Sequence, residues 1–382
     1  MASPQLYDLV PQKLGLRRWL HGLVDLPTPS MFRPSVWLFG LRVYRLLLRV
    51  AARLIEIQWA VIADMVTTVR GRDTRLRNIA NGDASRPDRR SIALYVHFST
   101  SGIVSEMVLR QVEEYNRLGF EVIFISNAHS LTDASWEAVR KRVALAVHRR
   151  NYGYDFGAWK DLSAEALKRW PDATELLLVN DSVLGPLHPL DSALATMRGG
   201  GDGVFGLLES LQGGTHLQSW FVLARGSRAI ADTAAFLDAL RLSASKWKVI
   251  QRGELRLARH MLHLGHKVAA IHSYRKLLDE TLADPEERAY LAEMLPFLAP
   301  LAKLTTPEAT QLLRQKLISR PLNPAHHLWR VLARHQEAAF LKTELIRRNP
   351  GQIPGVEETW KTVVQSNTTC PLPIIEAHLA TL

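Results

Sequence analysis

Asn180-Asp181-Ser182 combines residue types that could hold a divalent cation against a phosphate-bearing ligand. It directly follows the apolar run 176–179, where a buried strand would end. One carboxylate and two neutral oxygens suit Mg²⁺ or Mn²⁺, because these cations prefer oxygen ligands and stabilise a departing diphosphate. Asp181 and Ser182 are therefore predicted metal ligands. An Asp-x-Asp pattern would offer two carboxylates, so the alternative is a plain turn capped by Asp181 and Ser182.

A second segment, Arg149 to Lys160, mixes aromatic rings, two glycines, an amide, an acid and several basic residues. Glycine lets a ligand approach the backbone, aromatic faces stack on a base or a sugar, and Arg and Lys suit phosphate. The mixture predicts a ligand-binding loop. An aromatic-rich loop packed into the core is the structural alternative.

Two of the 14 histidines stand where a ligand could reach them. His97 lies at the end of the first predicted strand, and His272 follows the short apolar strand 267–271. We expect His97 to lie within reach of the ligand edge of the sheet, and His272 to be a candidate metal ligand. For either residue, the alternative is a histidine satisfied within the core.

The elements that must position these residues alternate between strand and helix. Strands are predicted at 92–98, 121–126, 175–179, 204–208, 218–223 and 267–271, with helices at 105–118, 136–147 and before Trp170. Such alternation predicts an α/β fold with a mainly parallel sheet flanked by helices. Ligands bind such sheets beyond the carboxyl ends of the strands, which points to the loops after Phe98, Ser126 and Val179.

Three regions follow from this pattern. Residues 1–90 form a basic, amphipathic helical region that ends in the turn-rich linker 81–90. Residues 91–280 form the α/β domain that carries the candidate ligand site. Residues 281–382 show helical periodicity interrupted by prolines, and we expect no strand there.

Composition is that of a soluble globular protein: 382 residues, 47% hydrophobic and 22% charged. A lone cysteine, Cys370, excludes an intramolecular disulfide and a Cys-rich zinc site, which indicates a reducing compartment. No signal peptide is expected, since the first 30 residues lack a basic start followed by an apolar run and a cleavage site.

The positive charge is concentrated at one end of the chain. Residues 1–90 hold 15 Lys and Arg against 7 Asp and Glu, so this quarter carries a surplus of eight out of the net +11. Such a basic end predicts an anionic partner. An RNA-associated protein would share the high pI, but it would not explain why the charge is confined there, and no nucleic-acid-binding motif is present. We therefore expect no nucleic acid partner.

Within the basic end, residues 36–69 predict an amphipathic helix. Arg42, Arg45, Arg49 and Arg53 recur every three or four residues, along one side of such a helix. Four arginines in twelve residues make a poor transmembrane span. The segment suits a helix lying on an anionic membrane surface. The alternative is a helix packed on the protein with a solvated basic face.

In combination these segments resemble the rhamnan synthesis protein F family of bacterial glycosyltransferases. The resemblance rests first on Arg150-Asn-x-Gly-Tyr-Asp-Phe-Gly-Ala-Trp-Lys160 and on residues 178–186. It continues through residues 216–221, Glu254, Asn323-Pro324 with Trp329, the segment 340–345 and Asn349-Pro350. It spans about residues 92–356, and residues 1–90 lie outside it.

The resemblance implies a GT-A-like fold and transfer of a hexosyl group, typically L-rhamnose from dTDP-L-rhamnose, onto a cell-surface polysaccharide. Such acceptors are carried on a polyprenyl lipid, which implies a cytoplasmic protein peripheral to the inner face of the bacterial cell membrane. The protein would then contact the anionic membrane surface through the segment 36–69.

Inverting transfer needs a carboxylate to take the acceptor proton, and positive charge or a metal to stabilise the diphosphate. Glu254 is the first candidate base and Asp155 the second. The diphosphate is assigned to Asp181 and Ser182 with Mg²⁺ or Mn²⁺, helped by Arg150, Lys160 and His272. The nucleotide sugar is further assigned to His97, Asn151, Tyr154, Asp155 and Asn180. The alternative for Glu254 is a glutamate that only stabilises the start of a helix. The alternative for the whole chain is a non-catalytic glycan-binding or scaffold protein.

Overall fold

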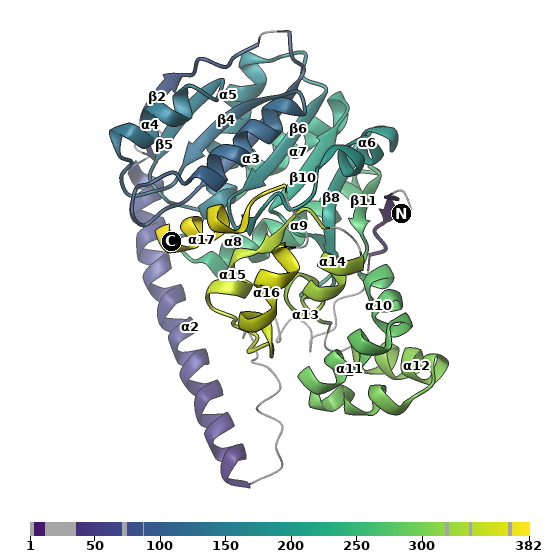
Figure 1. The fold of residues 1–382 in the computed structure, drawn as a ribbon. Coiled ribbons are helices and arrows are strands. Elements are labelled where there is room, and N and C mark those ends of the chain that lie inside the picture. The colour runs from purple at the N-terminus through teal and green to yellow at the C-terminus, as the bar shows by residue number, and fades with distance from the viewer. Residues whose placement is uncertain are drawn as a thin grey trace.

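The chain folds around a ten-stranded sheet whose strand order is β1-β11-β8-β10-β6-β3-β4-β5-β2, with β9 paired to β8 (Figure 1). The computed structural model describes residues 4–11, 36–70, 75–86, 88–317, 321–335, 338–365 and 369–382. The strands are β1 (Tyr7–Asp8), β2 (Leu76–Asn81), β3 (Ser91–His97), β4 (Phe120–Ser126), β5 (Leu145–Arg149), β6 (Glu175–Asn180), β8 (Gly203–Ser210), β9 (His216–Leu217), β10 (Phe221–Arg225) and β11 (Val268–His272).

The sheet is mostly parallel in its centre. β3 pairs in parallel with both β4 and β6, β4 with β5, and β11 with β8. β10 runs antiparallel between β6 and β8, and the edge strands β1 and β2 are antiparallel to their neighbours. The carboxyl ends of β3 and β6 therefore lie side by side, and this edge receives the polar residues of the candidate site.

Strand periodicity divides the core into two layers. In β3, Ala93 and Tyr95 belong to one buried cluster, while Leu94 and Val96 belong to the other, because successive side chains point to opposite faces. Strands buried on both faces read as continuous apolar runs, as in Phe120–Ser126, where every residue is buried.

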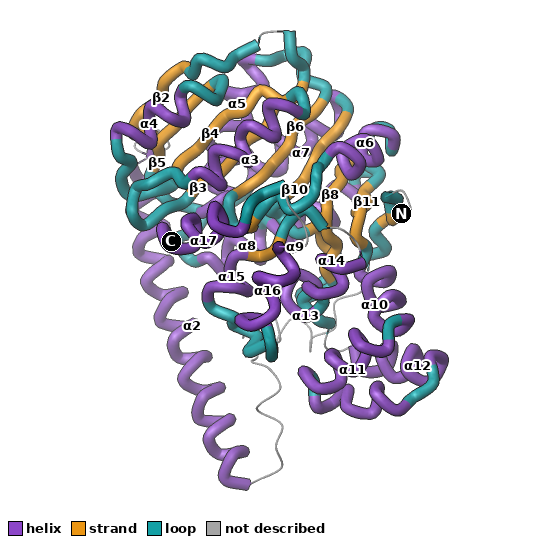
Figure 2. The backbone as a smooth tube through the Cα atoms, viewed as in Figure 1, coloured by secondary structure: helices purple, strands orange, loops and turns teal. Residues whose placement is uncertain are grey.

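Helices cover both faces (Figure 2). The first face carries α3 (Glu106–Arg117), α4 (Asp133–Arg140) and α6 (Asp191–Gly199), whose apolar side chains join one core cluster. The second face carries α5 (Tyr154–Arg169), α7 (Ser227–Ala239) and α9 (Glu254–His263), which join the other. A short helix, α8 (Lys246–Arg252), precedes α9.

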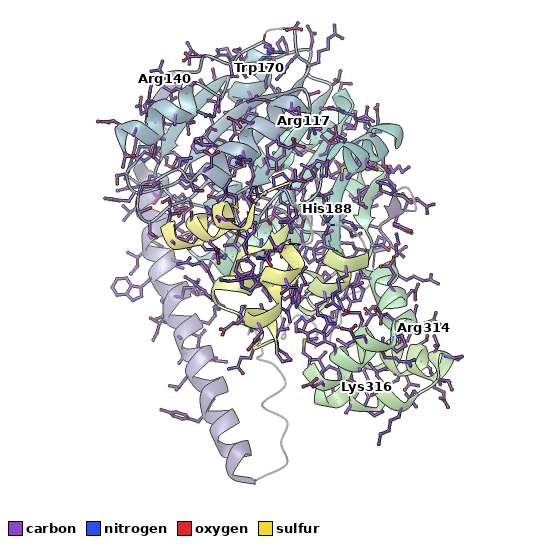
Figure 3. All side chains as sticks on the ribbon, in the orientation of Figure 1. Arg117, Arg140, Trp170, His188, Arg314 and Lys316 are labelled. Carbon is purple, nitrogen blue, oxygen red and sulfur yellow. The ribbon has the colours of Figure 1, made fainter. Side chains whose placement is uncertain are left out.

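The C-terminal third is helical and lies below the carboxyl end of the sheet (Figure 1). Its elements are α10 (Tyr274–Ala283), α11 (Pro285–Met294), the 3₁₀ helix η3 (Pro296–Lys303), α12 (Thr306–Leu317), α13 (Pro324–His327), α14 (Trp329–His335), α15 (Thr343–Arg347), α16 (Val356–Gln365) and α17 (Leu372–Thr381). Arg314 and Lys316 mark the outer part formed by α12 (Figure 3). α17 returns to α3, where the Ser105 hydroxyl and the His378 ring nitrogen Nδ1 are 2.7 Å apart.

Most predicted strands are confirmed, and three expectations are wrong. The predicted helix 136–147 ends at Arg140, and Leu145–Arg149 is strand β5, buried between β4 and β2. The predicted strand 218–223 starts too early, because β10 begins at Phe221 and the separate strand β9 ends at Leu217, before the predicted range. A strand does follow residue 280: β12 (Leu341–Lys342) pairs with β7 (Val183–Leu184) in a separate two-stranded sheet. β1 and β2 also join the main sheet from outside residues 91–280.

The amphipathic helix expected at 36–69 is α2 (Val36–Arg70). It lies along one edge of the molecule, and its N-terminal half extends past the body (Figure 1). In the described part of the chain, no helix has the length and apolar character needed to cross a membrane.

Candidate active site

Asp181 joins the ends of the two central strands. It directly follows β6, and its backbone N–H donates to the carbonyl of Val96 at 3.1 Å. Its Oδ2 accepts a hydrogen bond of 2.7 Å from the backbone N–H of Phe98, the residue after β3. The carboxylate is thereby fixed at the carboxyl edge of the sheet, where the sequence predicted a ligand site.

Asn180 connects this edge to the start of α5. Its Nδ2 donates to Oδ2 of Asp155 at 2.9 Å. Its Oδ1 accepts from the backbone N–H of Ser182 at 3.1 Å and from the Ser182 hydroxyl. One amide side chain thus orients both the acid in the first turn of α5 and the turn after β6.

The turn before α5 has an unusual backbone that delivers Asp155 to the site. Gly153 has φ of 77°, and Tyr154 has φ of 52°, a left-handed value that is uncommon for residues with a side chain. Gly157 permits the close approach that follows, since a Cβ there would lie 2.1 Å from the carbonyl oxygen of Tyr152. The glycines of this segment are therefore structural.

Arg149 holds the turn before α5 through hydrogen bonds from its guanidinium. It is fully buried, and its guanidinium donates to Asp161 at 2.9 Å, to Oδ1 of Asn127 at 2.6 Å and to the carbonyl of Tyr152 at 2.8 Å. Arg75 donates to the same Asp161 through two bonds of 3.0 and 2.6 Å. Burial lowers the pKa of Arg149, and the charge of Asp161 opposes that shift.

Lys342 reaches the site from the C-terminal third. β12 places it opposite Val183, and its Nζ donates to Oγ of Ser182 at 2.7 Å. Burial lowers the pKa of Lys342, while the charges of Glu254 and Asp155 raise it. We call Asp155, Asn180, Asp181, Ser182 and Lys342 the site cluster.

The two carboxyl groups of the site cluster have raised pKa values. Burial, reinforced by the charge of Asp155 and opposed by the hydrogen bond from Phe98, raises the pKa of Asp181 to about 8. Burial also raises the pKa of Asp155, against the charge of Lys342. Ionisation of both half-buried carboxyls at once is unfavourable, because the two negative charges repel each other. A bound cation would offset this repulsion.

Glu254 acts electrostatically on the site cluster. It is the first residue of α9, and its Oε1 accepts from the backbone N–H of Ser219 at 3.0 Å. Its charge raises the pKa values of Asp155 and Lys342, which places it within electrostatic reach of both. His216 is also close to Glu254, but burial lowers its pKa and its Nδ1 contacts the carbonyl of Gly214.

Other predicted residues make contacts elsewhere. The Nζ of Lys160 donates to the carbonyls of Asp238 and Leu240, at the C-terminal end of α7. The Tyr154 hydroxyl donates to the carbonyl of Ala244 at 3.1 Å. Arg150 and Asn151 are exposed at the surface next to this turn.

The two predicted histidines are buried. His97 stacks on Phe124, its Nδ1 is 3.1 Å from the Ser126 hydroxyl, and burial lowers its pKa to about 3. It is therefore neutral at physiological pH. His272 ends β11 and lines a largely apolar pocket together with Trp220 and Lys342. The structure thus brings together Asp155, Asn180, Asp181 and Ser182, and it places His97 and Lys160 among other partners.

A divalent cation is compatible with the carboxylates that are present. In the part of the chain that the structure describes, no three His, Cys, Asp or Glu side chains form a metal-binding group. Mg²⁺, however, is commonly held by one or two carboxylates together with substrate phosphates and water. Asp181 and Asp155 fit that arrangement, because their charges interact and no Lys or Arg donates a hydrogen bond to either in the described contacts.

Comparison with known sequences decides the family. A sequence model described as rhamnan synthesis protein F matches residues 122–319, which is just over half of the chain. The chain belongs to the rhamnan synthesis protein F family. It is also similar to uncharacterized protein y4gN of Sinorhizobium fredii, at 23% identity over 206 residues. That match covers 51% of this chain and 52% of the relative, so the chain spans about half the length of the relative it matches.

The rhamnan synthesis protein F match ends before Lys342, the residue that sequence reasoning missed. Lys342 belongs to the segment 340–345, which carries part of the family resemblance, but the sequence pattern there gives this lysine no role. One signal could have identified it: a single charge at the end of the apolar run 338–341. Lys246 was also missed; it is exposed at the start of α8, and its charge acts on Asp155.

Proposed function

We propose that the protein is a glycosyltransferase that takes a hexosyl group, L-rhamnose in the first instance, from a nucleotide-diphosphate donor. The acceptor is a polysaccharide or a polyprenyl-linked glycan at the cytoplasmic face of the bacterial membrane. One observation carries the proposal: in a member of the rhamnan synthesis protein F family, two interacting carboxyls and a lysine meet at the carboxyl edge of a mostly parallel sheet.

The reaction is a single inverting displacement. The acceptor hydroxyl oxygen bonds to the anomeric carbon, the bond from that carbon to the diphosphate oxygen breaks, and a carboxylate takes the acceptor proton. Glu254 is the proposed base and Asp155 the second candidate, since both lie within electrostatic reach of Lys342.

Positive charge at the leaving diphosphate comes from Lys342 and Lys246 in this proposal. Both act electrostatically on Asp155, whereas the ammonium of Lys160 donates to carbonyls at the end of α7. Asp181 and Asp155, with Ser182 beside them, would hold Mg²⁺ or Mn²⁺. A bound cation would supply further charge stabilisation for the diphosphate. Arg150 and Asn151, being exposed beside the turn, are free to contact the nucleotide.

The test is a donor panel with the purified full-length chain. Thermal shift with dTDP, UDP and GDP, with and without Mn²⁺, would first show which nucleotide binds. Transfer is then followed by release of the nucleotide diphosphate from dTDP-L-rhamnose in the presence of a rhamnan oligosaccharide. Stabilisation by dTDP and its release on transfer are expected. Stabilisation by oligosaccharide alone, with no nucleotide effect, would instead support a glycan-binding scaffold protein.

A further inference from the structure

Helix α2 exposes a continuous apolar stripe to solvent. Ile55, Trp59, Ile62, Val66 and Val69 recur at intervals of four and three residues, the spacing of one helix face. Each is at least 45% exposed, with Trp59 at 67% and Val69 at 88%. Leu48 and Tyr44 continue the same stripe toward the N-terminus and are also exposed. Side chains of α2 project away from the body (Figure 3).

The opposite side of α2 holds its acidic residues against the protein. Glu56 accepts from the Ser245 hydroxyl at 2.7 Å. Asp64 accepts from the Ser243 hydroxyl at 2.8 Å and from the backbone N–H of Ala244 at 2.7 Å. Ala60, between them on this side, is buried. A helix on the surface of a soluble protein normally does the reverse, with its apolar side inward and its polar side in water.

The occupant of the apolar stripe is argued from charge. The sequence of α2 contains arginine at 42, 45, 49, 53 and 70, against only Glu56 and Asp64. Both acids are already engaged, Glu56 with Ser245 and with Arg53, and Asp64 with Ser243 and Ala244, and the sequence of the helix carries a surplus of three positive charges. A second copy of the chain would bring this same positive region against itself. An anionic lipid surface complements it, since the apolar side chains enter the interface and basic residues attract the headgroups.

We propose that α2 lies in the plane of an anionic bilayer surface, with the stripe Tyr44 to Val69 inserted at the headgroup boundary. This inference stands independently of the transferase proposal, because it uses no residue of the site cluster. It also gives α2 a way to position the site. α2 contacts the segment 243–245, which leads directly to Lys246, and Asp64 accepts from the Tyr152 hydroxyl at 3.1 Å, just before α5. Bilayer contact would hold this edge of the protein next to lipid-borne molecules.

Vesicle flotation of the full chain tests the proposal. The vesicles are phosphatidylcholine alone, or equal parts phosphatidylcholine and phosphatidylglycerol, at low and high salt. The chain is expected to float with the anionic vesicles, less so at high salt. The triple variant Ile55→Gln, Trp59→Gln, Ile62→Gln is expected to lower partitioning at least about tenfold, because three partly exposed apolar side chains lose their transfer free energy.

The matched control is Ile79→Gln, which changes an exposed apolar residue of β2, 51% exposed, outside α2. It should float like the unchanged chain. All three substituted positions of α2 are at least 54% exposed, so circular dichroism should show an unaltered fold. Equal flotation of the triple variant, or equal binding to neutral vesicles, would overturn the proposal. A lipid-free dimer in light scattering that the triple variant dissociates would assign the stripe to a second copy instead.

Discussion

Asp181 carries a carboxyl group with a pKa of about 8 in the folded chain, against 3.8 for an ordinary aspartate. Between these pH values the folded chain keeps a proton that the unfolded chain has lost. Asp181 therefore lowers the free energy of unfolding as pH rises from about 4 to about 8. The Asp181→Asn variant removes this effect while keeping an oxygen to accept from Phe98.

We accordingly expect Asp181→Asn to raise the free energy of unfolding at pH 7 by about 1–3 kcal/mol, while it abolishes transfer. Denaturant melts at pH 5 and pH 8 would measure this, and the gain should be larger at pH 8. A variant less stabilised at pH 8 than at pH 5 would contradict the raised pKa. Full transfer activity with unchanged metal dependence would contradict the assigned role.

Lys342 is expected to matter for turnover because its ammonium lies at the site cluster. Lys342→Met should lower kcat about a hundredfold, by analogy with the loss of one preorganised donor to a leaving oxyanion. Lys361→Met, on an exposed lysine of α16, is the control and should leave kcat unchanged. Equal kcat for both variants would remove Lys342 from the reaction.

The choice of base rests on two carboxylates. Glu254→Gln is expected to abolish turnover with little change in donor binding, since the glutamine can still accept from Ser219. Turnover should be compared with that of Asp155→Asn, with donor binding measured by calorimetry. If Glu254→Gln turns over normally, while Asp155→Asn binds donor and metal normally but does not turn over, Asp155 is the base.

At the scale of elements, the start of α5 depends on one close backbone approach. Gly157→Ala would place a Cβ 2.1 Å from the Tyr152 carbonyl, so the turn that delivers Asp155 must move. We expect a loss of about 1–3 kcal/mol in the free energy of unfolding and a matching fall in activity. Gly199→Ala, at the end of α6, meets nothing within 4 Å and should be neutral or slightly stabilising. Similar thermal melts for both variants would refute this account.

The sequence predicted the sheet better than it predicted the site. Apolar runs such as 92–97 and 120–126 read directly as buried strands, and Asp181 could be placed at a strand end from order alone. Helix 136–147 was wrong because Val143 to Val147 is apolar enough to extend a helical pattern, while pairing of β5 with β4 and β2 decides its state. Lys342 could not be placed, since it is 160 residues from Ser182 and meets it only through tertiary packing.

At the scale of the whole molecule, the family match does not coincide with a folding unit. Residues 122–319 omit β3, which lies between β6 and β4 in the sheet. A fragment limited to 122–319 would leave a gap at the centre of the sheet. We expect it to lack a cooperative thermal transition, whereas the full chain shows one. Circular dichroism melts would measure this, and a sharp transition for the fragment would contradict the strand order.

The contact between Lys342 and Ser182 also has a consequence for the newly made chain. During synthesis, every strand of the main sheet leaves the ribosome before residue 342 does. The sheet and the carboxylates Asp155 and Asp181 can thus be assembled on a nascent chain that still lacks Lys342. A product cut short by a stop codon before residue 342 would then have most of the fold yet lack this lysine of the site cluster, so activity reports that translation has passed residue 342.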